Sequence, residues 1–353
     1  MNKGCHFCHL TLNDRLVIER LNKKNWTKKK IAEAIGCCER TVYYELKRAT
    51  YMHLNTDLTL EERYNPDMAE RLYRENLSKK GVQPKLASDN ELMNCLKELI
   101  VKNDYSPQAA LYHIQNEGLD FSVQIKSVGT VYRAIKQGIV DGVTMKKLPH
   151  GRRRKRSKRV VRQKRASAGT SIEKRPKKID ERDTFGNWEM DSVIGQASNK
   201  KTCLVFTERK TRMEIIEEMQ QHTSDEVVKA LNRLEKRFKS DFYKIFKTIT
   251  IDNGVEFQDF EGMEQALYRI GKRTKTYYCH PSRPDERGSN ENCNRLIRRK
   301  LPKGMNFDKK LNRTLVKEVE SWVNNYPRKL FNGKSALHMF QIELEKIGCR
   351  LRC

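Results

Sequence analysis

Two aspartates in this sequence lie in or directly after apolar segments that have the pattern of β-strands. Asp191 lies in "NWEMDSVIG", and Asp252 follows "TITI" directly before Asn253-Gly254, a pair that permits a sharp turn. Two carboxylates that face each other repel unless a cation lies between them, and their hard oxygens suit Mg²⁺ or Mn²⁺. Each aspartate alone could be a simple turn residue. Together, in a strongly basic chain, they indicate a metal site, which a third carboxylate would complete for in-line attack on a phosphodiester by two metal ions.

The third carboxylate is expected from "PSRPDERGSNEN", residues 281–292, which holds Asp285, Glu286 and Glu291. Prolines and a glycine predict a loop over 281–288, where Asp285 and Glu286 would face solvent or the neighbouring arginines. A helix begins directly after this loop and holds Glu291 in its first turn. Because a helix holds a side chain more rigidly than a loop does, we expect Glu291 to be the third ligand.

The elements that must position these carboxylates follow the order of an α/β fold. Strands are predicted at 185–195, 201–209 and 212–219, then a helix at 224–238 capped by Ser224, a strand running into Asp252, a helix "FEGMEQALYRIG", a strand "RTKTYYCH" and a helix "SNENCNRLIRRKL". This is the element order of a ribonuclease H-like fold. In such a sheet the first and fourth strands are neighbours, so Asp191 and Asp252 can approach each other although 60 residues separate them. A further helix, about 312–325, is expected to pack against this core.

The charge of the whole chain indicates a polyanionic partner. The 353 residues are enough for two or three domains, and the formal net charge is +27. Such an excess favours nucleic acid, with a basic membrane-surface protein as the alternative. The sequence has no run of about 18 apolar residues and no apolar N-terminal signal, so we expect a soluble, intracellular protein without a membrane partner.

The ten cysteines are scattered, and without a secretory signal we expect reduced thiols. Cys5 and Cys8 in "CHFCH" could suggest zinc. A zinc site needs four ligands, and no second pair follows at usable spacing, so we interpret this segment as an ordinary N-terminus.

Residues 10–48 have helical periodicity throughout. Thr27 can cap the second of three helices, Gly36 permits a tight turn, and residues 39–48 form the third helix. Two short helices joined around a glycine are typical of a helix-turn-helix, whose second helix enters the major groove of DNA. An ordinary helical hairpin is the alternative. The DNA-contact candidates on the third helix are Arg40, Thr41, Tyr43, Tyr44 and Lys47.

A second segment of the same design covers about 105–139, where Ser106-Pro107 begins a helix and "VGTVYRAI" lies in a later one. The stretch before it, roughly 50–90, is polar and predicted to be mostly helical. After it, residues 151–165 hold ten Lys or Arg and no core residues, so we expect an extended linker that lies along phosphates. The DNA-contact candidates of this linker are Arg152, Arg153 and Arg154.

Three motifs, "NWEMDSVIG", "TITIDNGVEF" and "PSRPDERGSNENCNRLIRRKLPKG", resemble those of the DDE transposases of bacterial insertion sequences, specifically the IS-thirty family, and the resemblance covers nearly the whole chain. It implies a catalytic core of the retroviral integrase type, Mg²⁺-dependent DNA cleavage and strand transfer with two ions per site, and helix-turn-helix modules that bind terminal inverted repeats. The motifs match Asp191, Asp252 and Glu291 to the three catalytic carboxylates. One departure is the spacing, because 38 residues lie between Asp252 and Glu291, a few more than is usual. That spacing alone would favour Glu286.

The resulting expectation is a multidomain protein of the bacterial cytoplasm, associated with the nucleoid and at least dimeric, because two DNA ends must be paired. We expect a first helix-turn-helix domain at 1–50, a helical region with a second one at 51–145, a basic linker at 146–180, the core at 181–345 and a tail at 346–353. Further DNA-contact candidates in the core are Arg287, Asn290, Asn294, Arg295 and Arg298.

Three alternatives stay open at this stage. A helix-turn-helix regulator without catalysis would explain the charge, but not the three carboxylates in a basic domain. A structure-selective nuclease with the same core would cut DNA without joining ends. A recombinase with a covalent intermediate would need a nucleophile such as Tyr277 or Tyr278, which lie in a predicted strand where aromatic residues normally pack.

Overall fold

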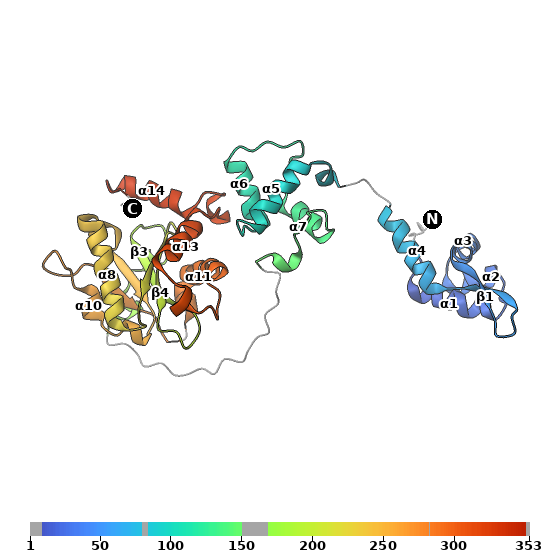
Figure 1. Ribbon diagram of the computed structural model, residues 1–353, viewed down its shortest axis with the longest axis horizontal. Helices are drawn as coiled ribbons and strands as arrows, with labels where there is room; N and C mark the ends of the chain where they lie inside the picture. Colours follow the sequence, from blue (N-terminus) through green and yellow to red (C-terminus); the bar gives the residue numbers. More distant parts are fainter. Residues whose placement is uncertain (1–8, 80–83, 150–168, 282, 351–353) are drawn as a thin grey trace, which may run out of the picture. The chain divides into compact units, whose positions relative to one another are not determined.

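The structure is a computed structural model that describes residues 9–79, 84–149, 169–281 and 283–350 (Figure 1). The chain divides into two compact units, Met1–Pro84 and Lys85–Cys353. The domain boundary expected after residue 50 therefore falls inside the first unit. The second helical region and the catalytic core, expected as separate domains, belong to one unit. None of the helices in the described ranges is long and apolar enough to cross a membrane.

The first unit begins with the three predicted helices, α1 (Leu12–Lys23), α2 (Lys28–Ile35) and α3 (Glu39–Ala49). Thr27 caps α2 as expected, since its side chain accepts a hydrogen bond from the backbone of Lys30. Gly36 ends α2 in the left-handed conformation, with φ of +79°, which a residue with a side chain rarely adopts. Ile18, Ile31 and Val42 pack together as the core of this unit.

The prediction of a mostly helical stretch over 50–90 is wrong for its first part. Residues 50–64 form an antiparallel hairpin of β1 (Thr50–Leu54) and β2 (Leu60–Tyr64), followed by helix α4 (Pro66–Lys79). Local turn chemistry explains the hairpin, because the carboxylate of Asp57 accepts hydrogen bonds from both the backbone and the hydroxyl of Thr59. Both strands are largely exposed, so they lack the alternation of buried residues by which a strand is recognised.

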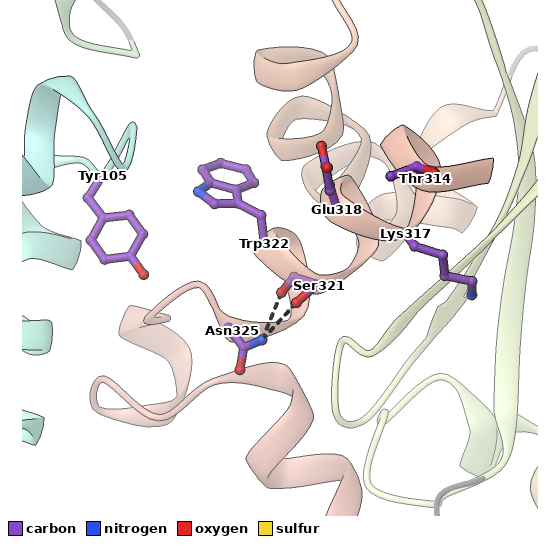
Figure 2. A pocket seen from close by; sticks show the side chains of 7 residues that line it. All are labelled: Tyr105, Thr314, Lys317, Glu318, Ser321, Trp322 and Asn325. Atoms are coloured by element: carbon purple, nitrogen blue, oxygen red, sulfur yellow. Dashed lines mark hydrogen bonds between the residues drawn. The ribbon is translucent and has the colours of Figure 1, made fainter. Parts of the chain in front are cut away.

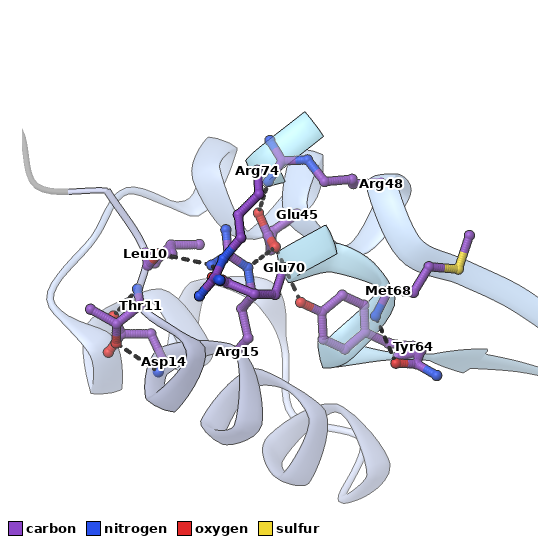
Figure 3. A network of polar contacts seen from close by, with 11 residues as sticks. Leu10, Thr11, Asp14, Arg15, Glu45, Arg48, Tyr64, Met68, Glu70 and Arg74 are labelled. Atoms are coloured by element: carbon purple, nitrogen blue, oxygen red, sulfur yellow. Dashed lines mark hydrogen bonds and ion pairs between the residues drawn. The ribbon is translucent and has the colours of Figure 1, made fainter. Parts of the chain in front are cut away.

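A buried ion-pair network joins α1, α3 and α4 (Figure 3). The Arg15 side chain is only 1% exposed and donates to Glu45 at 2.7 Å and to Glu70 at 2.5 Å. The hydroxyl of Tyr64 donates to the same carboxylate of Glu45 at 3.2 Å. Burial and the charge of Glu45 raise the pKa of Tyr64. The network therefore fixes three helices and the hairpin against one another.

We predict that Arg15→Met destabilises the first unit by about 3–5 kcal/mol, because it removes the fully buried cation and leaves Glu45 with only the partly exposed Arg48 as an ion-pair partner. Hydrogen exchange of the full chain should show lost protection in peptides from α1 and α3 and unchanged protection in the second unit. Lys23→Met is the matched control, since it breaks an exposed pair with Glu19 and should cost no more than about 0.5 kcal/mol. Equal protection in Arg15→Met and wild type would contradict this role of the network.

The second unit opens with α5 (Asn90–Val101), α6 (Pro107–Asn116) and α7 (Val128–Lys136), which form a helical module. Ser106 caps α6 and Pro107 is its first residue, as predicted. The remaining elements of this unit are η1 (Lys85–Ser88), η2 (Met145–Lys147), η3 (Ile172–Lys174), η4 (Lys177–Ile179), β3 (Asn187–Ile194), β4 (Thr202–Glu208), β5 (Glu214–Met219), α8 (Ser224–Phe238), η5 (Lys239–Asp241), α9 (Phe242–Ile245), β6 (Thr248–Ile251), η6 (Val255–Phe257), α10 (Phe260–Glu264), β7 (Lys275–Tyr278), η7 (Pro284–Arg287), α11 (Gly288–Lys300), α12 (Phe307–Lys310), α13 (Arg313–Asn325), η8 (Lys329–Phe331) and α14 (Ala336–Lys346).

Five strands form one mixed sheet in the order β5-β4-β3-β6-β7. The first three strands in sequence pair antiparallel, and β3 pairs parallel with β6, with Glu189 opposite Thr250. β6 in turn pairs parallel with β7. This is the order that the ribonuclease H-like interpretation predicts, and the expected adjacency of the first and fourth strands is confirmed.

Side-chain alternation along the strands assigns one helical layer to each face of the sheet. Trp188 and Met190 of β3 pack in a core with α8, α9 and α14, whereas Val193 packs with α11 and α13 on the other face (Figure 1). Because residues two apart on a strand share a face, Glu189 and Asp191 lie on the α11 side. Asp191, the catalytic candidate of β3, is therefore covered by α11, the helix that carries Glu291.

Three local predictions in the core need correction. The helix expected over "FEGMEQALYRIG" ends at Glu264, because the chain then turns so that Gln265 bridges to Lys272. The cap of α8 is Thr223 rather than Ser224, and its side chain makes no capping hydrogen bond. The last part of the expected basic linker packs on the core, where Ser171 bridges to Tyr278 of β7.

Helix α13 packs against the core as predicted. Its Asn324 exchanges hydrogen bonds with the backbone of Glu214, and Glu320 accepts from the backbone of Ile216, so that α13 satisfies the free edge of β5. On its other side α13 holds the helical module, because Trp322 donates to the carbonyl of Asn103. A cavity of about 540 Å³ lies at this seam (Figure 2). It is lined by Tyr105, Thr314, Lys317, Glu318, Ser321, Trp322 and Asn325.

Glu214 is fully buried under this helix, and burial raises its pKa to about 8. The folded state therefore retains a proton that the unfolded state releases between the ordinary pKa of 4.5 and about 8, so this group's contribution to stability falls as pH rises through that window. We predict that Glu214→Gln gains a few kcal/mol relative to wild type between pH 5 and pH 8, by at most about 1.4 kcal/mol per pH unit. Urea unfolding at both pH values measures this gain, and Glu217→Gln on the same strand is the control. A constant difference between Glu214→Gln and wild type would contradict the prediction.

Candidate active site

The structure brings Asp191 and Asp252 together at one guanidinium. The two Nη atoms of Arg287 lie 3.2 Å from Asp191 Oδ1 and 3.1 Å from Asp252 Oδ2. Arg287 comes from η7, directly before α11, and also donates to the carbonyl of Met190. Two carboxylates from adjacent parallel strands thus share one cation, which is the arrangement expected where their mutual repulsion must be compensated.

The turn after β6 fixes the position of Asp252. Its Oδ1 accepts a hydrogen bond from the backbone of Gly254 at 2.8 Å, while Asn253 donates to the carbonyl of Cys279 at 2.7 Å. A side chain at Gly254 would have to displace the carboxylate of Glu256, because a Cβ there would lie 2.4 Å from one of its oxygens. The sequence Asp-Asn-Gly therefore holds the carboxylate of Asp252 at the end of its strand.

The electrostatics of the pair favour a bound cation. Burial raises the pKa of Asp191, the Arg287 guanidinium opposes that rise, and the charge of Asp252 adds to it. The pKa of Arg287 is itself raised, since the two aspartates outweigh the effect of its burial. One guanidinium neutralises only one of the two carboxylates, so the pair keeps an excess negative charge.

Glu291 lies in the first turn of α11 as predicted, but its carboxylate does not join the pair in this structure. The side chain is 57% exposed and forms an ion pair with Arg295 at 2.7 Å. Within the residues that the structure describes, no three His, Cys, Asp or Glu side chains are grouped to hold a metal ion. Arg287 and Asn294 lie four residues before and three after Glu291 and both contact Asp191, so all three project from one side of the helix. The position of Glu291 on α11 thus faces the pair, while its side chain turns toward Arg295.

Glu286, the other candidate, is engaged elsewhere. It accepts hydrogen bonds from the backbone of His280 at 2.9 Å and contacts the ring Nδ1 at 2.7 Å. The opposite ring nitrogen of His280 lies 3.1 Å from Glu173. The pKa of His280 is raised by these two glutamates, Glu286 first. The side chain of Asp285 lies outside the described residues.

The two asparagines of α11 have different surroundings. Asn294 donates to Asp191 Oδ2 at 2.7 Å, and its amide oxygen is buried and has no hydrogen-bond partner in the described part of the chain. Asn290 is 1% exposed, and its backbone donates to Glu189 at 2.8 Å. The predicted DNA contact by Asn290 is therefore not available in this structure, whereas Asn294 places an unused oxygen beside the carboxylate pair.

The other predicted DNA contacts are distributed over both units. Tyr43, Tyr44 and Lys47 are exposed on α3, and Arg40 donates to the hydroxyl of Tyr44 at 3.3 Å. Thr41 is partly buried and contacts the thiol of Cys38. In the core, Arg295 is exposed and Arg298 donates to the carbonyl of Ile194. Arg152, Arg153, Arg154, Cys5 and Cys8 lie outside the described residues.

Two features of the site were not predicted. His222 lies 2.9 Å from Glu256, and the charge of Asp252 also acts on His222. The glutamate of "DNGVEF", four residues after Asp252, was the available signal for this pair. The bridging position of Arg287 was also missed, although two facing aspartates require a cation and this arginine follows the loop that was singled out.

The tyrosines of β7 are buried, and Tyr278 donates to the carbonyl of Phe257, so neither is an exposed nucleophile.

The residues present fit a divalent metal. Asp191 and Asp252 offer carboxylate oxygens, which are the ligands that Mg²⁺ and Mn²⁺ prefer. The amide oxygen of Asn294, which has no hydrogen-bond partner in the described part of the chain, is also a hard oxygen ligand. The guanidinium of Arg287 shows that a cation is accommodated between the two carboxylates. A metal ion there would be held by the chain's own hard oxygen donors.

No family model matches the chain. It is 28% identical over 327 residues to the transposase for insertion sequence element IS4351 of Bacteroides fragilis, covering 91% of this chain and 92% of that protein. It is 33% identical over 167 residues to transposase InsI for insertion sequence element IS30A of Escherichia coli, covering 47% of this chain and 41% of that protein. In a crystal structure, the catalytic core domain of BIV integrase is 17% identical to this chain and matches 47% of this chain and 99% of that chain at a TM-score of 0.35. The description of the fold does not depend on this match. The similarity to these transposases extends along most of the chain, and it is consistent with an insertion-sequence transposase of the IS-thirty (IS30) family.

Proposed function

We propose that this transposase binds the terminal inverted repeats of its own element and catalyses metal-dependent cleavage and strand transfer on double-stranded DNA. The observation that carries the proposal is the pair of carboxylates, Asp191 and Asp252, held together by Arg287 where adjacent parallel strands end. An ion pair that serves only structure does not need two like charges beside each other, whereas phosphoryl transfer by the two-metal mechanism uses such a pair to hold its cations.

In this proposal Asp191, Asp252 and Glu291 hold two Mg²⁺ or Mn²⁺ ions. Bound there, the ions would polarise the phosphodiester and lower the pKa of the attacking water or 3′-hydroxyl. The three carboxylates fix the positions of these charges on two strands and one helix. Glu291 would reach the pair by rotation of its own side chain, because its position on α11 already lies between two residues that contact Asp191.

Arg287 is proposed to protect the carboxylate pair before DNA and metal arrive. It holds both side chains in place and offsets part of their repulsion. After metal ions replace Arg287 between the two carboxylates, its guanidinium lies next to the expected path of the DNA strand. It can then contact a phosphate, as the sequence suggested. Asn294 orients Asp191 through the hydrogen bond from its amide nitrogen.

Both helical modules are proposed to bind DNA. In the first unit, α2 and α3 have the order of a helix-turn-helix, and α3 exposes Tyr43, Tyr44 and Lys47. In the second unit α6 and α7 form the corresponding pair. Because strand transfer requires two element ends, the active form is proposed to be at least a dimer, acting on DNA in the bacterial cytoplasm.

The experiment that tests this function uses the full chain with a duplex that carries one end of its own element. Binding is measured in EDTA, and cleavage is then followed after addition of Mg²⁺ or Mn²⁺. The proposal predicts binding under both conditions and strand cleavage only with metal. Binding without cleavage in any divalent metal would instead support a regulator that lacks catalysis.

A further inference from the structure

A second site in the core is a cavity of about 340 Å³ on the α11 side of the sheet. It is lined by Ile172, Glu173, Arg175, Asp180, Arg182, Arg209 and Glu286. None of these residues belongs to the carboxylate pair. Among them, only Glu286 was considered for a function on the basis of the sequence. Three arginines around one small cavity are unusual, because buried guanidinium groups are costly unless an anion compensates them.

The arginines at the inner end of the cavity are deeply placed. Arg209 is 2% exposed and donates to the buried carboxylate of Glu189 at 2.7 Å. Arg175 is 8% exposed and donates to the hydroxyl of Thr250 at 2.8 Å and to the carboxylate of Asp180. The backbone N–H of Arg182 donates to Ile179, whereas its side-chain Nε is buried and has no hydrogen-bond partner in the described part of the chain. Two of the three guanidiniums are thus built into the core.

Positive charge is in excess at this inner end. Behind Arg209 lies a fourth arginine, Arg212, which donates to the carbonyl of Arg209 and to Ser289. Against these four guanidiniums stand three carboxylates, since Glu189 and Asp180 form ion pairs with them and Glu208 acts on Arg212. Burial lowers the pKa of Arg209, and Arg175 and Arg182 lower it further by repulsion.

Unused donors point to a missing partner. The Nε atoms of Arg175, Arg182 and Arg209 are all buried, and none has a hydrogen-bond partner in the described part of the chain. Arg182 and Arg212 also have positive φ angles of +62° and +60°, a strained conformation for residues with side chains. Three unsatisfied N–H groups at the cavity, together with the strained backbone of Arg182 in its lining, are the features of a site that is completed by a ligand.

The mouth of the cavity has a different character. Glu173 and Glu286 lie there, and both contact the ring of His280. Asp180 is 58% exposed on the loop after η4 and lies between Arg175 and Arg209. The Asp180 carboxylate lies where a bound anion would contact Arg175 and Arg209. Because Asp180 is exposed on a loop, its side chain can move aside when such an anion binds.

The cavity lies beside the carboxylate pair on the same face of the sheet. Glu189 and Thr250 precede Asp191 and Asp252 by two residues on their strands, a separation of about 6.6 Å. Glu286 lines the cavity, and its neighbour Arg287 contacts the pair. A nucleic-acid strand whose reacting phosphate lies at the pair can therefore place a nearby phosphate at the cavity.

We propose that this arginine cavity binds a backbone phosphate of the DNA strand that enters the active site, with Arg175, Arg182 and Arg209 as donors and Asp180 displaced. This inference rests on the proposed function, since it assumes that DNA is the substrate. Guanidinium groups are suited to it, because their planar N–H groups match phosphate oxygens in pairs. The site positions the strand and takes no part in the chemistry.

The test is a scan with methylphosphonates, which replace single phosphates of the duplex end by neutral groups. Binding of the full chain is measured in EDTA, so that cleavage plays no part. At one position near the cleavage point the modification should weaken binding by wild type about 10-fold, the value of one charge-assisted contact. Arg182→Gln should bind unmodified DNA about 10-fold more weakly and lose nothing further at that position.

Controls separate this contact from general charge. Arg233→Gln removes an arginine from α8 on the opposite face, where it forms a partly exposed pair with Glu217, and should keep the wild-type profile. Arg182→Lys should restore part of the coupling. Because Arg182 is only half-buried, the Gln variant is expected to fold, which an unchanged far-UV circular dichroism spectrum and melting temperature would verify.

Two outcomes would overturn the proposal. One is a methylphosphonate profile that is the same in wild type and Arg182→Gln. The other is a rise in melting temperature with inorganic phosphate that depends on Arg182, without any coupling in the scan, which would assign the cavity to a free phosphate ion. Wild type that binds DNA and shows the coupling but never cleaves it would count against the proposed function and leave the phosphate site intact.

Discussion

Asp252→Asn is expected to abolish DNA cleavage by the full chain, with a loss of at least about 10³-fold in single-turnover rate, because several kcal/mol of transition-state stabilisation depend on the metal ligands. The substitution keeps the shape of the side chain and removes its charge, leaving Arg287 paired with Asp191 alone. Binding to the element end in EDTA should stay within about twofold of wild type, since in our proposal the helical modules outside the carboxylate pair carry the binding.

The matched control is Asp225→Asn, an exposed aspartate in the first turn of α8 on the opposite face of the sheet. It removes the same charge and should leave cleavage and binding unchanged. Cleavage by Asp252→Asn at a rate within about fivefold of wild type would remove Asp252 from the mechanism. Equal loss in both variants would indicate a general effect of charge.

Glu291→Gln is expected to reduce cleavage by at least about 10²-fold, whereas Glu286→Gln should reduce it by less than about 10-fold. The reason is placement. Glu291 lies between Arg287, directly before α11, and Asn294 in α11, which both contact Asp191, whereas Glu286 is held by His280. Both variants exchange a carboxylate for an amide of the same shape, so each controls for the other. The reverse order of effects would assign the third ligand to Glu286.

Runs of apolar residues were sufficient to predict the five strands of the central sheet. Runs such as "TCLVFTE" and "TITI" are completely or nearly completely buried in the structure. The strand order and the adjacency of β3 and β6 were predicted from the interpretation of these elements as a ribonuclease H-like fold. The placement of Asp191 and Asp252 at one edge followed from that adjacency. These features depend on hydrophobic periodicity, which a sequence displays directly.

The features that sequence could not supply depend on contacts between distant segments. The strands of the hairpin at 50–64 are largely exposed, so their pairing left no apolar pattern to read. The helix expected over "FEGMEQALYRIG" ends at Glu264, where the chain turns so that Gln265 bridges to Lys272 and the Glu264 carboxylate accepts hydrogen bonds from Thr276 of β7. The arginine cavity is assembled from residues 175–212 and the start of α11, and no local pattern connects them.

The choice of the third carboxylate shows the same limit. The helix start at 288 and the place of Glu291 in its first turn were predictable, but the partner of its carboxylate was not. Arg295 is four residues along the same helix, which is the ordinary spacing for an ion pair on an exposed surface. Such pairs contribute little to stability, so the contact with Arg295 presents a small barrier to movement of Glu291.

The most direct test of the account is the joining of a pre-cleaved element end to target DNA by the full chain in Mg²⁺. Joining uses the same carboxylates as cleavage and distinguishes a transposase from a nuclease with the same fold. The account predicts joined products with wild type, and none above background with Asp191→Asn even though that variant binds the end normally. Cleavage without joining by wild type, or joining by Asp191→Asn at the wild-type rate, would contradict it.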